Sequence, residues 1–304
     1  MKNKYRAYAV MGATGHVGKV VAERLLQIGA QVRVIGRSAE RLRSLVDQGA
    51  IAHVGAFDDV EALTKAFMGV VGAFVMIPPD YSTGDFLAFQ DRVGSAIAQA
   101  LRTTGVPFVV NLSSVGAHLN GRTGPIRGLR QQEARLNEIK DLKVLHLRPG
   151  YFMETLFWSI PTIQSSGING SPLTADLPIP MVATRDIGEK AGEFLAELQL
   201  RGQTAFEFFG PRPVTMQEAT TVLGRAIGKP ELKYIQFAYK VTEEAMVGAG
   251  LSPDYARLLI ELDRSLNDGL IRPTQPMTQD HLGKTSIEHF AQEFAVAFRA
   301  ATRM

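Results

Sequence analysis

The 304-residue chain contains no cysteine. This absence excludes disulfide bonds, thiolate nucleophiles and cysteine-ligated metals, and it fits a reducing compartment. The chain also lacks an apolar run of about 18 residues, the length that a membrane-spanning helix requires. Residues 1–6 lead directly into an apolar strand pattern without the h-region of a secretory signal. We therefore expect a cytoplasmic protein that does not enter a membrane.

An excess of one charge is also missing. The 33 Lys and Arg residues and 30 Asp and Glu residues leave a formal net charge of only +3, and the two signs are interspersed. A nucleic-acid footprint needs clustered positive charge, so we expect no direct contact with nucleic acid. The six histidines show neither metal-ligand spacing nor an accompanying carboxylate cluster, and no metal site is predicted.

The first half of the chain alternates short apolar segments with helical patterns. Strands are predicted at residues 7–11, 31–35, 50–54, 72–77, 108–112 and 144–147, and helices at 15–28, 40–46, 60–68, 85–103 and 126–139. This alternation is typical of an α/β fold with a doubly wound parallel sheet of the Rossmann type, covered by helices on both faces. We expect an NAD(P)-binding domain over residues 1–150.

After Pro149 the regular alternation gives way to segments punctuated by glycine, serine and proline. Thr215 and Glu218 form a capping-box pattern for a helix that ends at Gly228, and further helices are predicted at 253–267 and 286–301. We expect residues 151–304 to form a smaller C-terminal α+β lobe that binds a substrate or a partner. This lobe is expected to pack closely on the first domain and to return some strands or helices to it.

A glycine-rich segment joins the first strand to the first helix. Gly12 permits a tight turn, Gly15 lets backbone N–H groups approach a pyrophosphate, and Gly18 lets the helix pack on the sheet. The predicted cofactor contacts in this segment are Gly12, Thr14, Gly15, His16, Val17 and Gly18. The alternative interpretation is a glycine-rich turn that binds no ligand.

The end of the second strand carries positive charge. An NAD-specific site places an acid here to hold the ribose hydroxyls, but this chain has Arg37 and Ser38, followed by Arg41 one helical turn later. Arginine matches a 2′-phosphate, which an acid would repel. We therefore predict that Arg37, Ser38 and Arg41 contact NADP(H), in preference to NAD(H). The alternative for Arg37 is a solvated loop cation.

Three segments together carry a family resemblance. They are Gly12-Ala13-Thr14-Gly15 with Gly18, Asn111-Leu112-Ser113-Ser114-Val115-Gly116, and Leu147-Arg148-Pro149-Gly150-Tyr151-Phe152-Met153-Glu154. With them the sequence resembles the NmrA-like branch of the atypical short-chain dehydrogenases/reductases over nearly its whole length. The resemblance implies that NAD(P) lies between the carboxyl edge of the sheet and the second lobe. It also implies either an NADPH-dependent reductase or a redox-sensing regulator.

Two positions depart from the pattern of related proteins. Carbonyl-reducing short-chain dehydrogenases use a tyrosine and a lysine four residues later, but none of the seven tyrosines here has that lysine. The register places the pair at about Leu129 and Glu133, so we do not expect ordinary alcohol dehydrogenation. Ala56 stands where relatives often have an aspartate that contacts adenine. Either Asp58 substitutes for it or adenine is held more loosely.

Several side chains are predicted to surround the reactive end of the cofactor. Ser113 and Tyr151 are the candidate catalytic residues, and both are also predicted cofactor contacts, together with Ile77 and Pro78. An apolar wall for the acceptor ring is predicted from Phe152, Phe157 and Trp158. For Ser113 the alternative is a hydroxyl that caps the strand end, and for the aromatic residues it is core packing.

Two functions remain open at this point. The first is an NADPH-dependent reductase that transfers hydride directly to a quinone-like or other conjugated small molecule. Hydride transfer needs chiefly proximity, and a reduced quinone takes its proton from water, so a tyrosine–lysine pair is not required. The alternative is a non-catalytic NADP(H) sensor that acts through a regulatory protein partner. The acceptor, the partner and the oligomeric state are open.

Overall fold

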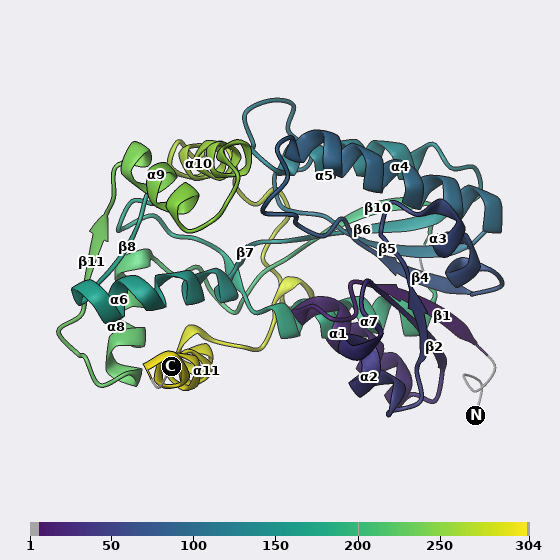
Figure 1. Ribbon diagram of the computed structural model, residues 1–304, viewed down its shortest axis with the longest axis horizontal. Helices are drawn as coiled ribbons and strands as arrows, with labels where there is room; N and C mark the ends of the chain where they lie inside the picture. The colour runs from purple at the N-terminus through teal and green to yellow at the C-terminus, as the bar shows by residue number, and fades with distance from the viewer. Residues whose placement is uncertain (1–5, 200, 303–304) are drawn as a thin grey trace.

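The computed structural model describes residues 6–199 and 201–302 of the chain. Residues 1–5, which contribute to the prediction about a secretory signal, lie outside the described part. The chain folds into two lobes, and the larger one, on the right of Figure 1, is built on a parallel sheet. The strands of this sheet run from the outer end of the larger lobe toward the second lobe, so their carboxyl ends face it.

The sheet has seven strands, all paired in parallel, in the spatial order β10-β6-β5-β4-β1-β2-β3. Their bounds are Ala7–Met11 (β1), Gln31–Gly36 (β2), Ile51–Val54 (β3), Gly72–Val75 (β4), Phe108–Leu112 (β5), Lys143–Pro149 (β6) and Gln203–Phe208 (β10). The direction in which strands are added reverses between β1 and β4. This point is where open α/β sheets bind ligands, and the predicted Rossmann fold is confirmed.

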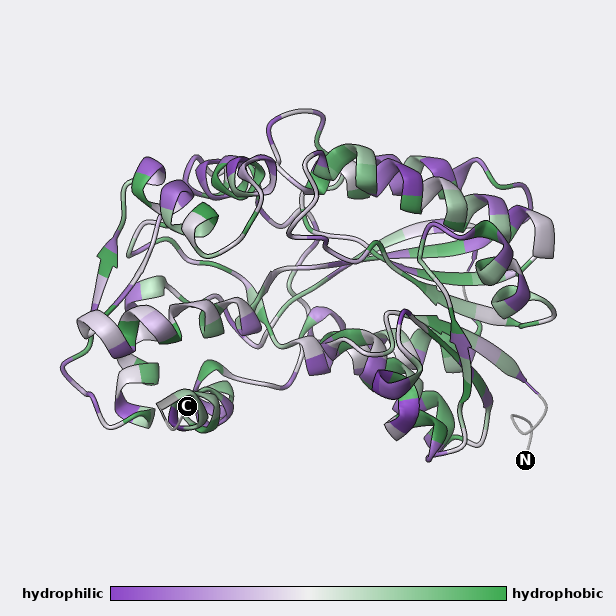
Figure 2. Ribbon diagram, in the orientation of Figure 1, coloured by the Kyte–Doolittle hydropathy of each residue, from purple (hydrophilic) through white to green (hydrophobic). Residues whose placement is uncertain are grey.

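Helices cover both faces of the sheet. Successive residues of β1 point to opposite faces: Ala9 packs with the core under α3, α4 and α5, and Val10 packs with the core under α1, α2 and α7. The helix bounds are His16–Gln27 (α1), Ala39–Val46 (α2), Val60–Phe67 (α3), Phe86–Thr104 (α4), Ile126–Asn137 (α5) and Thr184–Glu197 (α7). Figure 2 shows apolar strands between helices whose outward faces are polar. None of the described helices is long and apolar enough to cross a membrane.

The predicted strands differ from the observed ones mainly at the centre and edge of the sheet. β4 ends at Val75 rather than at residue 77, since its last paired residue lies opposite Asn111 of β5. β6 continues to Pro149 rather than ending at residue 147, because β10 pairs with it as far as Phe208. Both β10 and α7, which packs on α1, come from beyond residue 150. The larger lobe therefore uses two stretches of the chain.

The second lobe holds two small parallel pairs of strands and the remaining helices. β7 (Tyr151–Phe152) pairs with β9 (Met181–Val182), and β8 (Ile168–Ser171) pairs with β11 (Lys233–Gln236). The helices are η1 (Met153–Ser159), α6 (Ile160–Ser166), α8 (Met216–Ala226), α9 (Tyr239–Gly248), α10 (Pro253–Asn267), η2 (Gln279–His281) and α11 (Ile287–Thr302). The Thr215 hydroxyl accepts a hydrogen bond from the Glu218 amide at 3.1 Å, so the predicted cap is present.

Candidate functional site

The glycine-rich turn lies at the carboxyl end of β1, beside the point where the strand order reverses. Gly12 has a φ of +64°, in the left-handed region that favours glycine. Gly15 is the N-cap of α1, has no side chain to cap the helix, and is followed by a first turn without an acidic residue. The first amide N–H groups of α1 therefore have no partner within the helix and form a site suited to an anion.

The geometry separates the roles of two glycines in this turn. A β-carbon on Gly18 would overlap the backbone carbonyl of Gly12 and lie 2.8 Å from the Met11 oxygen. A β-carbon on Gly15 would meet nothing closer than 3.4 Å, at the Gly12 oxygen, and Gly15 is exposed. Gly18 thus permits the close approach of helix and strand, while the space beside Gly15 is open and fits a pyrophosphate. Of the other predicted contacts here, His16 is exposed, Thr14 is half-buried and Val17 is buried.

Two exposed arginines follow β2. Neither Arg37 nor Arg41 forms an ion pair within the described residues, and both are suited to hold a phosphate. The charge of Arg37 contributes to a lowered pKa of Asp80, although hydrogen bonds from Ser82 are the larger cause. The Ser38 hydroxyl accepts a hydrogen bond from the Arg41 amide at 3.3 Å and so caps α2.

The other predicted cofactor contacts follow β3, where the adenine is expected, and β4. Asp58 follows β3 and is exposed, and its neighbour Asp59 caps α3 by accepting a hydrogen bond from Ala62 at 3.0 Å. Ile77 is buried and Pro78 is half-buried, just beyond the carboxyl end of β4. These positions surround the same edge of the sheet as the glycine turn. Their contacts with a dinucleotide stay a prediction.

A buried polar cluster lies at the carboxyl ends of β5 and β6, where the reactive end of the cofactor is predicted. The Ser113 hydroxyl donates to Glu133 Oε1 at 2.5 Å, and Arg148 donates to both carboxylate oxygens of Glu133, at 2.8 and 2.5 Å. Burial by itself would raise the pKa of Glu133, but the hydrogen bonds from Arg148 and Ser113 hold it below its ordinary value. Glu133 is therefore ionised at neutral pH, and both of its carboxylate oxygens accept hydrogen bonds.

This cluster limits what Ser113 can do. Its hydroxyl proton is already donated to Glu133, and the residue is only 4% exposed. Leu129, one turn before Glu133 on α5, packs on the core that lies under α3, α4 and α5. The sequence did not reveal the link between Ser113 and Glu133, because the two residues lie on different elements 20 positions apart.

A buried histidine was not singled out by its sequence context. His146 Nδ1 lies 3.1 Å from Asn111 Nδ2, and its Nε2 lies 3.0 Å from Asn137 Oδ1. Burial lowers the pKa of His146 to about 4, so the ring is neutral at pH 7. With hydrogen bonds to two amides, this histidine joins β5, β6 and the end of α5 and is already satisfied by its neighbours.

Tyr151, the other catalytic candidate, lies just beyond β6 and is partly exposed. Burial is the main cause of a strongly raised pKa of its hydroxyl, and the charge of Asp263 on α10 adds to it. The hydroxyl therefore stays protonated and is a weak acid. Asp263 was not predicted, because an aspartate within an amphipathic helix has the sequence pattern of a solvated residue.

The aromatic residues predicted to form one wall lie in three different environments. Phe152 packs against the core under α1 and α7, while Phe157 packs on Phe290 and Phe294 of α11 with ring centroids 5.2 and 5.8 Å apart. Trp158 is 50% exposed and lies edge-to-face on Tyr81, at 6.1 Å. The 3-10 helix η1 turns the consecutive residues Phe157 and Trp158 to different sides, and Phe152 precedes this helix. The role of the three rings as a wall for the acceptor stays a prediction.

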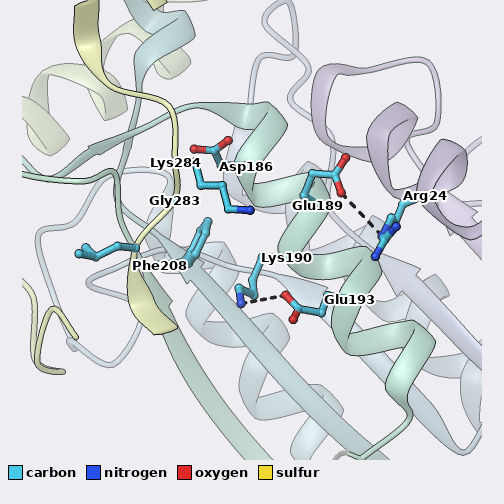
Figure 3. A pocket seen from close by; sticks show the side chains of 9 residues that line it. Arg24, Asp186, Glu189, Lys190, Glu193, Phe208, Gly283 and Lys284 are labelled. Atoms are coloured by element: carbon cyan, nitrogen blue, oxygen red, sulfur yellow. Dashed lines mark ion pairs between the residues drawn. The ribbon is translucent and has the colours of Figure 1, made fainter. Parts of the chain in front are cut away.

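A pocket of about 330 Å³ lies elsewhere, beside α7. Figure 3 shows its charged rim, in which Arg24 pairs with Glu189 and Lys190 pairs with Glu193. These charges largely neutralise one another, and no residue of the glycine turn lines the pocket. It is therefore not the candidate cofactor site. Within residues 6–199 and 201–302 no group of three His, Asp or Glu side chains is placed to hold a metal ion.

The chain is similar to several known proteins. The sequence model of the NmrA-like family matches residues 6–291. The chain belongs to the NmrA-like family. It is 30% identical over 294 residues to a (4-alkanoyl-5-oxo-2,5-dihydrofuran-3-yl)methyl phosphate reductase of Streptomyces griseus, covering 95% of this chain and 98% of that one. It is 24% identical to quinone oxidoreductase 2 of Escherichia coli, covering 86% and 88%.

Solved structures of other proteins share the fold. The NADPH-dependent quinone oxidoreductase of Escherichia coli, complexed with NADPH, superposes with a TM-score of 0.80 at 21% identity, covering 94% of this NmrA-like chain and 99% of that one. The negative transcriptional regulator NmrA, in complex with NADP, gives 0.77 at 16% identity, covering 98% of both chains. The resemblance seen in the sequence is confirmed, and it extends through both lobes.

Proposed function

We propose that this protein is an NADPH-dependent reductase that delivers hydride directly to a quinone-like or otherwise conjugated small molecule. The observation that carries the proposal is that two features meet at one edge of the sheet. The glycine turn leaves the N-terminus of α1 without a side-chain cap, and Arg37 and Arg41 form no ion pair with a described residue. The turn suits a pyrophosphate and the arginines suit a 2′-phosphate. When bound, the reduced nicotinamide supplies the hydride.

Two relatives support the class of acceptor. The Streptomyces griseus reductase is named for an oxo-dihydrofuran that carries an alkanoyl group, and the Escherichia coli enzyme is named for quinones. Both names describe conjugated acceptors. Such acceptors do not need a tyrosine–lysine pair to hold an alcohol proton, which agrees with an ionised, hydrogen-bonded Glu133 at the corresponding register.

A second function is favoured by one observation. The NADP-bound regulator NmrA matches 98% of this chain, second lobe included, so a sensor can have the same architecture. In that case the chain binds NADP(H) and acts through a protein partner without turnover. The two functions share the cofactor site; the reductase transfers hydride to a small molecule, whereas the sensor acts on a protein partner without turnover.

The cofactor part of the proposal is tested by titrating NADPH and NADH and following nicotinamide fluorescence. A charge-assisted contact is worth roughly 1.5–3 kcal/mol, so NADPH should bind about ten- to a hundredfold more tightly than NADH. Arg37→Ala should lose this preference with little change for NADH. Arg43→Ala, an exposed arginine on the same helix as Arg41, is the control and should bind like the wild type. Equal affinity for both cofactors would contradict the assignment.

The catalytic part is tested by NADPH oxidation with a panel of quinones, α,β-unsaturated carbonyl compounds and simple aldehydes. We expect turnover with the conjugated acceptors and negligible oxidation of simple secondary alcohols in the reverse direction. If the protein binds NADPH but reduces no member of the panel, the sensor function replaces the reductase.

A further inference from the structure

The Ser113 hydroxyl can accept a hydrogen bond from a ligand but has no proton left to donate to one. Its proton is directed to Glu133 Oε1 at 2.5 Å, and Arg148 donates to both oxygens of that carboxylate, at 2.8 and 2.5 Å. A carboxylate held in this way only accepts hydrogen bonds, so the direction of the serine proton is fixed. A serine oxygen can accept while its proton is donated elsewhere, and Ser113 therefore offers an acceptor and no donor.

The backbone of Ser113 is fixed as well. Its amide donates to the Leu147 carbonyl at 2.7 Å, which continues the pairing of β5 with β6 one residue beyond the end of β5. Arg148, which holds Glu133, is the next residue of β6. Both Ser113 and Glu133 are buried, so water does not readily replace either partner. The position of the serine oxygen is thus set by β6 and α5 together.

The register of the sheet places Ser113 at the level of the glycine turn. Val10 of β1, Phe74 of β4 and Val110 of β5 lie in one row across the sheet. Ser113 and the glycine turn follow two or three residues later on their strands and therefore lie at the same level. β5 is two strands from β1, and neighbouring strands are about 4.8 Å apart, so Ser113 lies about 10 Å across the sheet from the turn.

The two ends of a dinucleotide are assigned to different halves of this sheet. A fold of this type binds one nucleotide on each side of the point where the strand order reverses. Arg37 and Arg41, which suit the 2′-phosphate of the adenosine, follow β2 on one side of that point. The nicotinamide is then expected on the other side, at the carboxyl ends of β4, β5 and β6. Residues 76–79, directly after β4, are apolar, whereas Ser113 follows β5 with a polar side chain.

We propose that Ser113 accepts a hydrogen bond from the carboxamide NH₂ group of the nicotinamide, and that Glu133 and Arg148 are positioning residues that keep the hydroxyl an acceptor. The inference rests on the NADP(H) site of the proposed function. A carboxamide has a donor side and an acceptor side, and an oxygen that only accepts selects the donor side. This contact favours one orientation of the nicotinamide ring, and so one face of it toward the molecule that receives the hydride.

Ser114 provides a matched comparison within the same segment. Its hydroxyl donates to the carbonyl of the next residue, Val115, at 2.9 Å, and the residue is half-buried. Among the described residues no carboxylate accepts a hydrogen bond from this hydroxyl. The two adjacent serines therefore differ in the group that fixes the hydroxyl, and only Ser113 is tied to Glu133.

The test compares binding of NADP⁺ with binding of its 3-acetylpyridine analogue, in which a methyl group replaces the NH₂ group and the carbonyl is kept. Dissociation constants are measured by titration calorimetry, so no turnover is needed. The wild type should bind the analogue about ten- to a hundredfold more weakly, because the buried Ser113 oxygen loses its donor. Ser113→Ala should bind NADP⁺ more weakly and lose most of this discrimination. Ser114→Ala is the control and should discriminate as the wild type does.

Glu133→Gln tests the positioning role. Glutamine keeps an oxygen for Arg148 and turns an NH₂ group toward Ser113, so the serine oxygen accepts from it and the serine proton becomes free to point toward a ligand. The ratio of the two dissociation constants should therefore fall in this variant. If Glu133 only supported the fold, the variant would weaken binding of both ligands equally and leave the ratio unchanged, and that result would overturn the positioning role.

A cofactor fragment separates this inference from the cofactor site as a whole. 2′-Phospho-ADP-ribose lacks the nicotinamide, and Ser113→Ala and Ser114→Ala should bind it as the wild type does. Equal binding of NADP⁺ and the 3-acetylpyridine analogue by the wild type would overturn the inference, and so would an unchanged ratio in Ser113→Ala. If the wild type binds neither the fragment nor NADP⁺, the proposed NADP(H) site itself is wrong and the inference falls with it.

Discussion

Replacing Glu133 by glutamine should show what the buried cluster contributes to stability. Glu133 is 6% exposed, the Arg148 side chain is 13% exposed, and the two are joined by hydrogen bonds of 2.8 and 2.5 Å. Removing one partner of such a pair leaves a buried charge uncompensated and costs about 3–5 kcal/mol. Glutamine keeps the shape and one acceptor, so we expect the free energy of unfolding to fall by about 3 kcal/mol.

The assay is urea unfolding at pH 7, followed by circular dichroism. The control is Glu138→Gln, whose partner Arg102 lies 3.8 Å away and whose side chain is 74% exposed, and it should change stability by less than about 0.5 kcal/mol. If Glu133→Gln lowers the free energy of unfolding by less than about 1 kcal/mol, or raises it, the reasoning is refuted. The free energy needed to remove the two charges from water would then cancel the attraction between Glu133 and Arg148.

The pH dependence gives a second check on the same variant. The pKa of Glu133 is lowered by Arg148 and Ser113 against the opposing effect of burial, so its stabilisation is present above the unfolded-state pKa, near 4.5. It is lost as the pH falls through the lower pKa of the folded state. The difference between wild type and Glu133→Gln should therefore be constant from about pH 6 to 8 and shrink toward pH 3.

Three further predictions concern the two lobes. Gly18→Ala should destabilise the fold by about 1–3 kcal/mol in thermal or urea unfolding because its β-carbon overlaps the Gly12 carbonyl, whereas Gly15→Ala should fold normally and lose NADPH affinity in fluorescence titration; the reverse pattern would contradict the assigned roles. The raised pKa of Asp263, about 7 against 3.8, means that stability is lost as the pH rises from about 4 to about 7. Asp263→Asn should therefore have a higher free energy of unfolding than the wild type at pH 8, by at most about 4 kcal/mol, and this gain should shrink toward pH 4. A gain that is the same at pH 4 and pH 8 in urea unfolding would contradict this. Trp158→Ala should raise the KM for the acceptor while NADPH affinity stays constant, because the exposed ring contacts the loop after β4, and an unaltered KM would exclude it from the acceptor site.

The lobe made of regular βα units was predictable because its signals are local. Strands buried on both faces appear as short apolar runs, and the ends of α1 to α4 carry a capping side chain or a nearby glycine, so residues 7–147 yield nearly the observed elements. The turn at Gly12 and the close approach at Gly18 are likewise properties of a few consecutive residues. The family resemblance followed from these segments together with the strand end at Arg148 and Pro149.

Tertiary structure alone decided which distant residues meet. β10 completes the sheet from beyond residue 200 because pairing with β6 depends on how the second lobe folds back, which no local pattern encodes. The same applies to the link between Ser113 and Glu133, to the separate environments of Phe157 and Trp158, and to Asp263. The protonation of that aspartate depends on burial by residues far away in the sequence, since desolvation is set by what surrounds a carboxyl group and not by its neighbours along the chain.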